Sequence, residues 1–491
     1  MNTQSLGSLL EGLSSLPLRG AADCVPQRLV EDSRQVKAGD VFLARGGEAV
    51  DGRSFIAAAE ASGAAAILSD EHGCSVAAGP AIQSSALAYD GAVLAHRLAE
   101  DPSESVTVVG VTGTNGKTTV SSVLAGVLGG DGACGLLGGV YRDDGRTRQA
   151  TRLTTPMASE VAMWLSDSIA AGCSRAVMEV SSHALAQQRV VGVRYAAAIF
   201  TNLSGDHLDY HGSMEEYARA KRTLFDDLDD DAVAIVNADD RASEGMTAGT
   251  RASVIRCAIN SGGEVHGTIL ESNTGGSRVN LCSPWGERVL CVPLVGVHNV
   301  MNAMQVLAAA CVLGVDFDDS CARLESAAAP PGRLERLNAR LHVYVDYAHT
   351  DGALEAVLKS LRAIIDPGAM LRVVVGCGGD RDQTKRPRMA AVATSHADRV
   401  WLTSDNPRTE DPDRILADML AGVASDDTER VQVEPDRRQA IYDAIAAAGP
   451  HDIVLIAGKG HERVQLIGTE SMPFDDRVVA AAALKEAGWT T

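Results

Sequence analysis

The most constraining feature of the chain is the stretch at residues 110–120, which reads GVTGTNGKTTV. It follows an apolar run at 105–109 that predicts a buried strand, and it leads into residues 121–128, which predict a helix. A strand, a glycine turn and a helix in this order place backbone N–H groups around an anion at the helix N-terminus. Lys117 would then reach the terminal phosphates of a nucleotide, and the Thr118 hydroxyl would lie on Mg²⁺. A chance glycine-rich turn is the alternative, but the flanking elements favour a phosphate loop.

The glycines of this loop are placed in an unusual way. The general pattern G-x-x-x-x-G-K-[ST] requires a glycine at Val111, whereas this chain has its glycines at 113 and 116, in the form TGTNGKTT. That form resembles the nucleotide loop of the Mur ligase family and of its folate-polyglutamylating relatives. The resemblance implies that ATP contacts the following loop residues: Gly113, Thr114, Asn115, Gly116, Lys117, Thr118 and Thr119.

Length and composition limit the class of protein. A chain of 491 residues predicts about three domains. A net charge of −20 argues against a nucleic-acid binder, because such proteins neutralise phosphates with a basic surface. The ten cysteines form no C-x-x-C pair, so reduced thiols are expected, and no apolar run is long enough for a membrane span. The first twenty residues lack a basic start and predict an amphipathic helix rather than a signal peptide. We therefore expect a cytoplasmic monomer.

The order of predicted elements indicates an α/β protein with three domains. Residues 1–100 hold short strands and an alanine-rich helix, and 101–332 hold the phosphate loop and apolar runs typical of parallel core strands. In 333–491 strands and helices alternate, as in a doubly wound domain. The resemblance implies a small UDP-binding domain, a central ATPase-like domain with a mostly parallel sheet, and a Rossmann-like C-terminal domain that binds an amino acid.

Two polar segments follow core strands of the middle block. Glu179 ends one apolar run, and His207 lies in the segment after the next one. A carboxylate and an imidazole from neighbouring strand ends can hold Mg²⁺ beside the γ-phosphate. A strand-end cap is the alternative for Glu179, while His183 and His211 have no obvious partner and favour core or surface positions.

Lys221 lies in a predicted helix at 214–225, where its spacing alone indicates a solvated face. The segment FTNLSGDHLDYHGSMEEYARAKRTLF resembles the Mur ligases that add the third residue of the peptidoglycan stem peptide. In that family the matching lysine is carbamylated by CO₂. Carbamylation converts a cation into a carboxylate-like oxygen donor suited to Mg²⁺.

The resemblance extends over the whole chain and implies further contacts. Asn299 in GVHNVMN matches a residue near adenine, and Arg333 and Asp346 match residues that the third domain brings to the nucleotide. The UDP-linked substrate is implied for Ser33, Thr154, Thr155, Ser181, Gln187 and Arg189.

The third block carries a motif that bears on the amino acid. Family members that use meso-diaminopimelate have D-N-P-R where this chain has Asp405, Asn406, Pro407 and Arg408. Diaminopimelate has a second carboxylate at its far end, and a guanidinium binds a carboxylate through two parallel hydrogen bonds. By the same resemblance, Glu462 holds the distal ammonium, Gly458 offers backbone contacts and Arg381 forms a second carboxylate clamp. A surface turn is the alternative for Arg408. The local basic cluster of Arg381, Lys385, Arg386 and Arg388 could serve an anionic small molecule, and a solvated helix start is an equally good interpretation of Lys385, Arg386 and Arg388.

The resulting expectation is an ATP-dependent amide ligase. It would add meso-diaminopimelate to the D-glutamate γ-carboxylate of UDP-N-acetylmuramoyl-L-alanyl-D-glutamate through an acyl phosphate. Alternatives within the class are L-lysine or another diamino acid as substrate, or a folylpolyglutamate-type ligase. A nucleotide switch and a catalytically silent scaffold are the alternatives outside it, although no Asn-Lys pair of an N-K-x-D guanine signature occurs.

Overall fold

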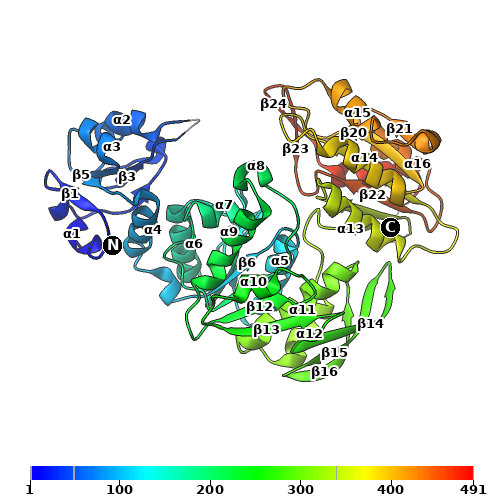
Figure 1. Cartoon of the computed structure of the whole chain (residues 1–491), viewed down its shortest axis with the longest axis horizontal. Helices are drawn as coiled ribbons and strands as arrows, with labels where there is room; N and C mark the ends of the chain where they lie inside the picture. Colours follow the sequence, from blue (N-terminus) through cyan, green and yellow to red (C-terminus); the bar gives the residue numbers. More distant parts are fainter. Residues whose placement is uncertain (1–2, 48–49, 339, 490–491) are drawn as a thin grey trace.

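In a computed structural model the chain forms three separate sheets with helices packed on them (Figure 1). The structure describes residues 3–47, 50–338 and 340–489. The sheets use residues 16–83, 107–292 and 335–457, in chain order. The α/β class predicted from the sequence is confirmed.

The first sheet has the strand order β1-β5-β4-β3-β2, and all of its pairings are parallel except that of β1 with β5. Its strands are β1 (Leu16–Leu18), β2 (Leu29–Val30), β3 (Val41–Ala44), β4 (Ala66–Ser69) and β5 (Ala81–Gln83). Its helices are α1 (Leu6–Leu9), α2 (Ile56–Ala61), α3 (Glu71–Val76) and α4 (Leu87–Leu98). The amphipathic helix predicted for the first twenty residues forms at α1 but does not continue after it, so the prediction is wrong for the rest of that segment. Gly12 has a φ of +77°, and the Ser14 and Ser15 hydroxyls turn inward to donate to Asp90.

The second sheet has eleven strands in the order β16-β15-β14-β13-β12-β11-β6-β10-β7-β8-β9. Its centre is parallel, as expected for apolar runs buried on both faces. The strands are β6 (Thr107–Thr112), β7 (Cys134–Leu137), β8 (Tyr141–Asp143), β9 (Arg148–Ala150), β10 (Arg175–Glu179), β11 (Ala197–Phe200), β12 (Val233–Asn237), β13 (Ser253–Ala258), β14 (Val265–Asn273), β15 (Gly276–Ser283) and β16 (Gly286–Val292). The helices are α5 (Lys117–Leu128), α6 (Ala158–Ala170), α7 (Ser182–Ala186), α8 (Leu208–His211), α9 (Met214–Asp226), α10 (Ser243–Thr247), α11 (Val297–Val312) and α12 (Phe317–Glu325).

The third sheet has the order β17-β18-β22-β19-β20-β21, and only β17 is antiparallel to its neighbour. Its strands are β17 (Glu335–Asn338), β18 (His342–Asp346), β19 (Leu371–Cys377), β20 (Arg399–Ser404), β21 (Val431–Val433) and β22 (Ile453–Ala457), and a separate hairpin joins β23 (Val464–Ile467) and β24 (Glu470–Pro473). The helices are α13 (Asp351–Arg362), α14 (Lys385–His396), α15 (Pro412–Leu420), α16 (Arg437–Ala446) and α17 (Asp476–Glu486).

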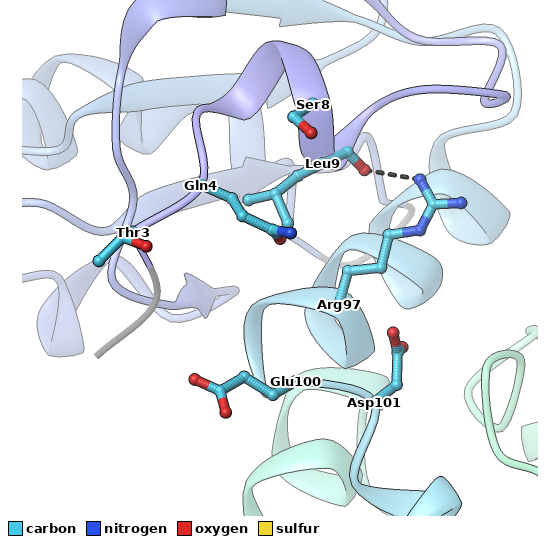
Figure 2. A pocket seen from close by; sticks show the side chains of 7 residues that line it. All are labelled: Thr3, Gln4, Ser8, Leu9, Arg97, Glu100 and Asp101. Carbon is cyan, nitrogen blue, oxygen red and sulfur yellow. Dashed lines mark hydrogen bonds between the residues drawn. The ribbon is translucent and has the colours of Figure 1, made fainter.

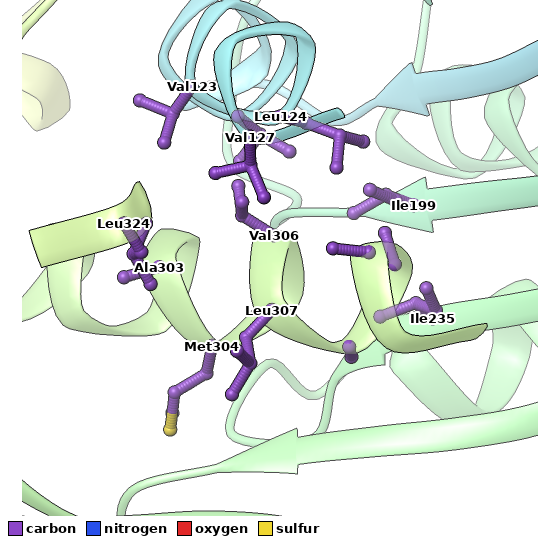
Figure 3. Close-up of a cluster of buried hydrophobic side chains, with 14 of the residues drawn as sticks. Val123, Leu124, Val127, Ile199, Ile235, Ala303, Met304, Val306, Leu307 and Leu324 are labelled. Atoms are coloured by element: carbon purple, nitrogen blue, oxygen red, sulfur yellow. The ribbon is translucent and has the colours of Figure 1, made fainter. Parts of the chain in front are cut away.

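The core of the middle domain fixes the helix that follows the phosphate loop. Side chains of α5 and α11 interleave above β11 and β12, as Figure 3 shows for Val123, Leu124, Val306, Ile199 and Ile235. Helix α11 is buried along almost its whole length, which is typical of a helix that is apolar on every side. The start of α5 is therefore held rigidly at the carboxyl end of the sheet.

All ten cysteines lie within the described residues as free thiols, and six of them are buried. Within the described residues, no helix has the length and apolar character needed to cross a bilayer.

Candidate active site

The predicted phosphate loop lies between β6 and α5. Gly113 and Gly116 adopt φ values of +148° and +85°, in the region that favours glycine. Lys117 begins α5 and folds back over the loop, where its Nζ donates to the carbonyl oxygens of Gly113 and Thr114 at 2.8 and 2.9 Å. The N-terminus of a twelve-residue helix and a lysine thus face the same loop, which is the arrangement that binds phosphate.

Residues after β11 hold this loop in place. Thr201 Oγ1 donates to the Asn115 carbonyl at 2.6 Å, and Asn202 Oδ1 accepts from the Asn115 N–H at 2.9 Å. The Thr114 N–H donates to the Asn202 carbonyl at 2.9 Å. Thr201 and Asn202 were not among the predicted site residues, although they stand directly after a predicted core strand. Their hydrogen bonds fix the loop before any ligand binds.

Lys221 is fully buried, so the solvated helix face predicted from its spacing is wrong. Its Nζ donates to the Gly113 carbonyl at 2.8 Å and lies 4.3 Å from the centre of the Tyr217 ring. Burial, reinforced by the charge of Lys117, lowers the pKa of Lys221 well below its ordinary value, although Asp206 opposes this. The neutral amine form is therefore favoured at this position.

Glu179 and His207 both lie near Lys117: the charge of Glu179 opposes the burial that lowers the pKa of Lys117, and the charge of Lys117 acts on His207. Glu179 ends β10, is 2% exposed, and accepts a hydrogen bond from the Gly139 N–H through Oε1 at 2.8 Å. The His207 Nε2 lies 3.5 Å from Asp206 Oδ2, and its backbone has a φ of +54°. Burial lowers the pKa of His207; Asp206 opposes this shift, and the charge of Lys117 adds to it. Both side chains therefore border the site of Lys117.

These residues fit a divalent cation by their chemistry. Glu179 Oε2 accepts no hydrogen bond from the described residues, and the Thr118 hydroxyl is buried at the start of α5. Hard oxygen donors beside a phosphate loop suit Mg²⁺. Among residues 3–47, 50–338 and 340–489 no group of three His, Cys, Asp or Glu side chains is placed to hold a metal. Only two of the expected metal ligands, Glu179 and His207, are residues of these types, so a nucleotide phosphate would have to complete the coordination of the ion.

The other histidines predicted to lie in the core or on the surface cluster beside His207. The rings of His183 and His207 are centred 4.7 Å apart, and His183 also packs on Tyr210 at 4.3 Å. His211 Nε2 lies 3.0 Å from Ser182 Oγ. The sequence showed no partner for His183 or His211 because these contacts join separate segments of the chain.

The third domain reaches the phosphate loop through Arg333. Its Nη2 donates to Thr118 Oγ1 at 3.2 Å, and its guanidinium stacks 4.4 Å from the Tyr347 ring centre. Asp346 does not bind Arg333 directly; its two oxygens accept from the N–H groups of Leu334 at 2.6 Å and Ala348 at 2.8 Å. Burial raises the pKa of Asp346, and Arg333 opposes this. Asp346 thus fixes the turn that presents Arg333.

Asn299 lies near the start of α11 and is 4% exposed. Its amide donates to the Val295 carbonyl at 2.8 Å, and its Oδ1 accepts from Asn302 at 2.9 Å. Asn302 also lies against Gly116, where a Cβ would stand 2.9 Å from its Oδ1. Asn299 is therefore connected to the phosphate loop through Asn302, a residue that the sequence analysis did not single out.

The residues predicted to bind the UDP-linked substrate form a chain beside Glu179. Thr155 Oγ1 donates to the Glu179 carbonyl at 2.8 Å and accepts from the Ser181 N–H at 3.0 Å. Arg189 donates to the Thr155 carbonyl at 3.0 Å and also to Gln187 Oε1. A Cβ at Gly139 would lie 3.4 Å from Thr154 Oγ1, so Thr154 borders the same turn.

Ser33 lies in a short 3-10 turn of the first domain, Ser33–Gln35. Two residues before it, Glu31 forms an ion pair with Arg45 at 3.3 Å. Burial raises the pKa of Glu31, and the charges of Arg45 and Arg189 oppose this. The segment that carries Ser33 therefore faces Arg189 of the middle domain.

The residues predicted to bind the amino acid gather after β19, β20 and β22. Asn406 Nδ2 donates to Glu462 Oε2 at 2.8 Å. Arg408 has a φ of +52°, and its Nη1 donates to the Gly379 carbonyl at 2.6 Å. A Cβ at Gly378 would lie 2.9 Å from Arg408 Nη1 and 3.8 Å from Arg381 Cγ, so the two arginines flank this glycine. Neither guanidinium pairs with a carboxylate of the described residues, which leaves two cations for an anionic ligand.

Asp405 lies at the same strand end and is nearly buried. Burial raises its pKa, while Lys459 lowers it. A Cβ at Gly458 would stand 2.9 Å from Asp405 Oδ2, so the backbone of Gly458 passes close to this carboxylate. Pro407 follows Asn406, and its carbonyl would lie 1.9 Å from a Cβ at Gly379. Because Gly458 and Gly379 have no side chain, the loops that carry them can lie close to the loop at residues 405–408.

Three cations of the basic cluster near residue 386 have partners within the protein, and Arg386 is not a solvated helix residue. Its side chain is fully buried and pairs with Glu410 at 2.9 Å and Asp418 at 2.8 Å. Lys385 donates to the His349 carbonyl and Arg388 pairs with Asp351. These cations hold α14 to its surroundings.

A surface hollow in the first domain lies elsewhere (Figure 2). It is bordered by α1 and the end of α4, and Arg97 crosses it to donate to the Leu9 carbonyl at 2.7 Å. None of its lining residues belongs to the loop, strand-end or arginine groups described above.

Comparison with known proteins identifies the family. Three family models match: "Mur ligase family, catalytic domain" at residues 29–99, "Mur ligase middle domain" at 111–310 and "Mur ligase, glutamate ligase domain" at 332–460. The chain belongs to the Mur ligase family. This confirms the resemblance drawn from TGTNGKTT.

Individual relatives agree with this assignment. A "UDP-N-acetylmuramoyl-L-alanyl-D-glutamate--2,6-diaminopimelate ligase" of Gloeobacter violaceus is 41% identical over 478 residues, covering 96% of each chain. A solved structure with the same enzyme name is 33% identical with a TM-score of 0.68, covering 95% of this chain and 96% of the other. A Mycobacterium tuberculosis folylpolyglutamate synthase, solved with ADP and AMPPCP, shares the fold at 21% identity and a TM-score of 0.61, covering 80% and 94%.

Proposed function

We propose that this Mur ligase is an ATP-dependent amide ligase that joins meso-diaminopimelate to the γ-carboxylate of D-glutamate in UDP-N-acetylmuramoyl-L-alanyl-D-glutamate. The observation that carries the proposal is that Arg408 and Arg381 have no carboxylate partner among the described residues and lie beside the Asn406–Glu462 hydrogen bond. Such a site suits a ligand end that has both a carboxylate and an ammonium. The full-length relatives named as diaminopimelate ligases support the same substrate.

The reaction proceeds in two steps. The substrate carboxylate attacks the γ-phosphorus of ATP, forming an acyl phosphate and releasing ADP. The neutral amine of the amino acid then attacks the acyl carbon, and the tetrahedral intermediate expels phosphate. Lys117 lies over the phosphate loop and Arg333 at Thr118, so both cations oppose the negative charge of the transferred phosphoryl group. Holding the acid, ATP and amine together supplies the proximity that this chemistry needs.

Magnesium is the expected companion of ATP in this family. Thr118, Glu179 and His207 would hold it, with Lys221 as the further ligand once carbamylated. When bound, the ion withdraws charge from the phosphoryl oxygens. Among these residues Glu179 offers the free oxygen Oε2, because the Gly139 N–H holds Oε1 in place.

Carbamylation of Lys221 follows from its surroundings. CO₂ reacts with a neutral amine to give a carbamate and a proton, and burial favours that neutral form here. The product anion would lie beside Lys117 and within reach of the loop carbonyl of Gly113. The carbamate anion would then be attracted by the charge of Lys117, which otherwise disfavours a second cation at Lys221.

The remaining sequence expectations stay proposals. We place the domain boundaries near residues 100 and 332, in the segments that separate the three sheets. Asn299 belongs on the adenine side, and Ser33, Thr154, Thr155, Ser181, Gln187 and Arg189 on the UDP-substrate side. A monomeric state and a cytoplasmic location also remain predictions.

The folylpolyglutamate-type alternative is less well supported. The folylpolyglutamate synthase above shares the fold at only 21% identity, whereas the diaminopimelate ligase of Gloeobacter violaceus is 41% identical. L-Lysine as the substrate is disfavoured by Arg408, because without a distal carboxylate this guanidinium has no anionic partner.

The experiment that tests the proposal traps the acyl phosphate. The protein is incubated with Mg-ATP, UDP-N-acetylmuramoyl-L-alanyl-D-glutamate and hydroxylamine, without an amino acid. The proposal predicts a hydroxamate of the UDP-linked substrate together with one ADP for each. Folate hydroxamate from a folate substrate in its place would support the alternative ligase, and ADP formation without hydroxamate would contradict acyl phosphate chemistry.

A further inference from the structure

Lys459 is a buried cation whose role the reaction scheme leaves unassigned. It follows β22 in a turn flanked by Gly458 and Gly460, whose φ values are +114° and +53°. Its side chain is 0% exposed. A buried ammonium is stable only where acceptors surround it.

The acceptors around Lys459 are all residues proposed to bind the amino acid. Its Nζ lies 3.0 Å from Asn406 Oδ1 and 3.0 Å from Glu462 Oε2, and 3.7 Å from Asp405 Oδ1. The first two contacts are hydrogen bonds, and the third is a longer ion pair. Because the side chain of Lys459 is fully buried among these partners, it does not itself face a ligand.

The same contacts orient Glu462. Its Oε2 accepts from both Lys459 and Asn406 Nδ2, the latter at 2.8 Å, whereas its Oε1 accepts from none of the described residues. The Glu462 side chain is 31% exposed, so this oxygen is open to a small molecule. Burial would raise the pKa of Glu462, but Lys459 and Asn406 outweigh it and lower the pKa, so the group stays anionic at neutral pH.

We propose that Lys459 is a positioning residue: it clamps Glu462 Oε2 and Asn406 Oδ1 so that Glu462 Oε1 points to the distal ammonium of the diamino acid. This inference rests on the proposed function. Arg408, held from the opposite loop by the Gly379 carbonyl, is left for the carboxylate at the same end of the ligand. Lys459 thus acts on selectivity for a distal amine without touching the substrate.

The first test is Lys459→Met, which removes the charge and keeps an unbranched chain of similar length. We expect the KM for meso-diaminopimelate to rise roughly 30-fold, the effect of losing a hydrogen bond to a charged group. The KM values for ATP and for the UDP-linked substrate should change less than about twofold, because neither substrate is expected to contact Glu462. Lys359→Met is the matched control, since Lys359 is exposed and pairs only with Glu355 on α13.

A double-mutant cycle separates positioning from a general structural role. If Lys459 acts through Glu462, then Lys459→Met should add little to the KM increase of Glu462→Gln. The second probe is 2-aminopimelate, which lacks the distal amine; its KM should be the same for wild-type protein and Lys459→Met. Should Lys459→Met fold poorly, Lys459→Gln keeps an amide donor, and direct titration with meso-diaminopimelate replaces kinetics.

The outcomes are distinguishable. A selective rise in the diaminopimelate KM that disappears in the Glu462→Gln background supports the inference. Additive effects, an unchanged diaminopimelate KM, or an equal rise for all three substrates would overturn it. Wild-type protein that ligates no diamino acid would instead refute the proposed function on which it rests.

Discussion

Gly113 is the position where a single methyl group tests the geometry of the phosphate loop. Its φ of +148° is rarely adopted by other residues, and an added Cβ would lie 1.9 Å from Thr201 Oγ1. That hydroxyl cannot simply rotate away, because it donates to the Asn115 carbonyl at 2.6 Å. The backbone N and O of Asn202 lie 3.1 Å from the same Cβ, so little space remains on that side either. Gly113→Ala should therefore displace the loop.

The expected magnitude follows from these contacts. Backbone strain at such a position costs about 1–3 kcal/mol, and losing the Thr201 hydrogen bond costs about 1 kcal/mol. The competent loop would then be disfavoured by about 2–4 kcal/mol, which corresponds to roughly 30-fold to 1000-fold weaker nucleotide binding. The effect should be local, because the loop lies outside the hydrophobic core.

Calorimetric titration with ATP and Mg²⁺ would measure this effect, with Tm as a check on the fold. Gly126→Ala is the matched control: it lies in α5 directly after the loop, and its added Cβ meets nothing within 4 Å. It should bind ATP normally and gain up to about 1 kcal/mol in stability. Adding Thr201→Ala to Gly113→Ala should restore part of the affinity by removing the closest contact. Wild-type affinity in Gly113→Ala alone would refute the steric argument.

Three further changes test other parts of the account. Lys221→Met should lower kcat on the order of 100-fold, and the intact wild-type protein in bicarbonate buffer should gain the mass of one CO₂ that this variant does not gain. No mass gain in the wild-type protein, together with an unchanged kcat in the variant, would contradict carbamylation. Arg408→Met should reduce kcat/KM for meso-diaminopimelate by about 30-fold, with little change in kcat/KM for L-lysine. Steady-state kinetics measures both values, and an equal reduction for the two amino acids would contradict binding of the distal carboxylate by Arg408. Burial lowers the pKa of His96 to about 4, and neither ring nitrogen has a hydrogen-bond partner among the residues that the structure describes. As pH falls, the imidazole of His96 is therefore protonated in the unfolded chain before it is protonated in the folded protein. The free energy of unfolding should decrease between about pH 6.5 and pH 4, by about 2 kcal/mol at pH 5. Urea unfolding at pH 7 and pH 5 measures this decrease, and His96→Leu should lose about 2 kcal/mol less than the wild-type protein between these two pH values.

Local patterns predicted the parts of the site that are contiguous in sequence. The phosphate loop could be placed because strand, glycine turn and helix follow one another, and Glu179 because it ends an apolar run. The polar segments after β18, β19, β20 and β22 could be grouped because parallel strands end at one edge of a sheet.

Contacts between distant segments could not be predicted. Lys221 lies on a helix whose spacing suggests a solvated face, yet its side chain is buried and donates to the loop carbonyl of Gly113. Lys459 stands between Gly458 and Glu462, which the sequence singled out, but its burial depends on Asn406, more than fifty residues away. Arg386 became a structural cation through Glu410 and Asp418 for the same reason. The N-terminal helix prediction failed because its apolar spacing says nothing of the Ser14 and Ser15 bonds to Asp90.

The most direct test of the central claim compares phosphate release with two amino acids. Purified protein receives Mg-ATP and UDP-N-acetylmuramoyl-L-alanyl-D-glutamate, and kcat/KM is determined for meso-diaminopimelate and for L-lysine. The account predicts turnover with meso-diaminopimelate and a preference of at least about 30-fold over L-lysine, the value of one charged hydrogen bond. Equal turnover of both would leave a ligase and contradict the role of Arg408. Phosphate release with neither would contradict the proposed reaction itself.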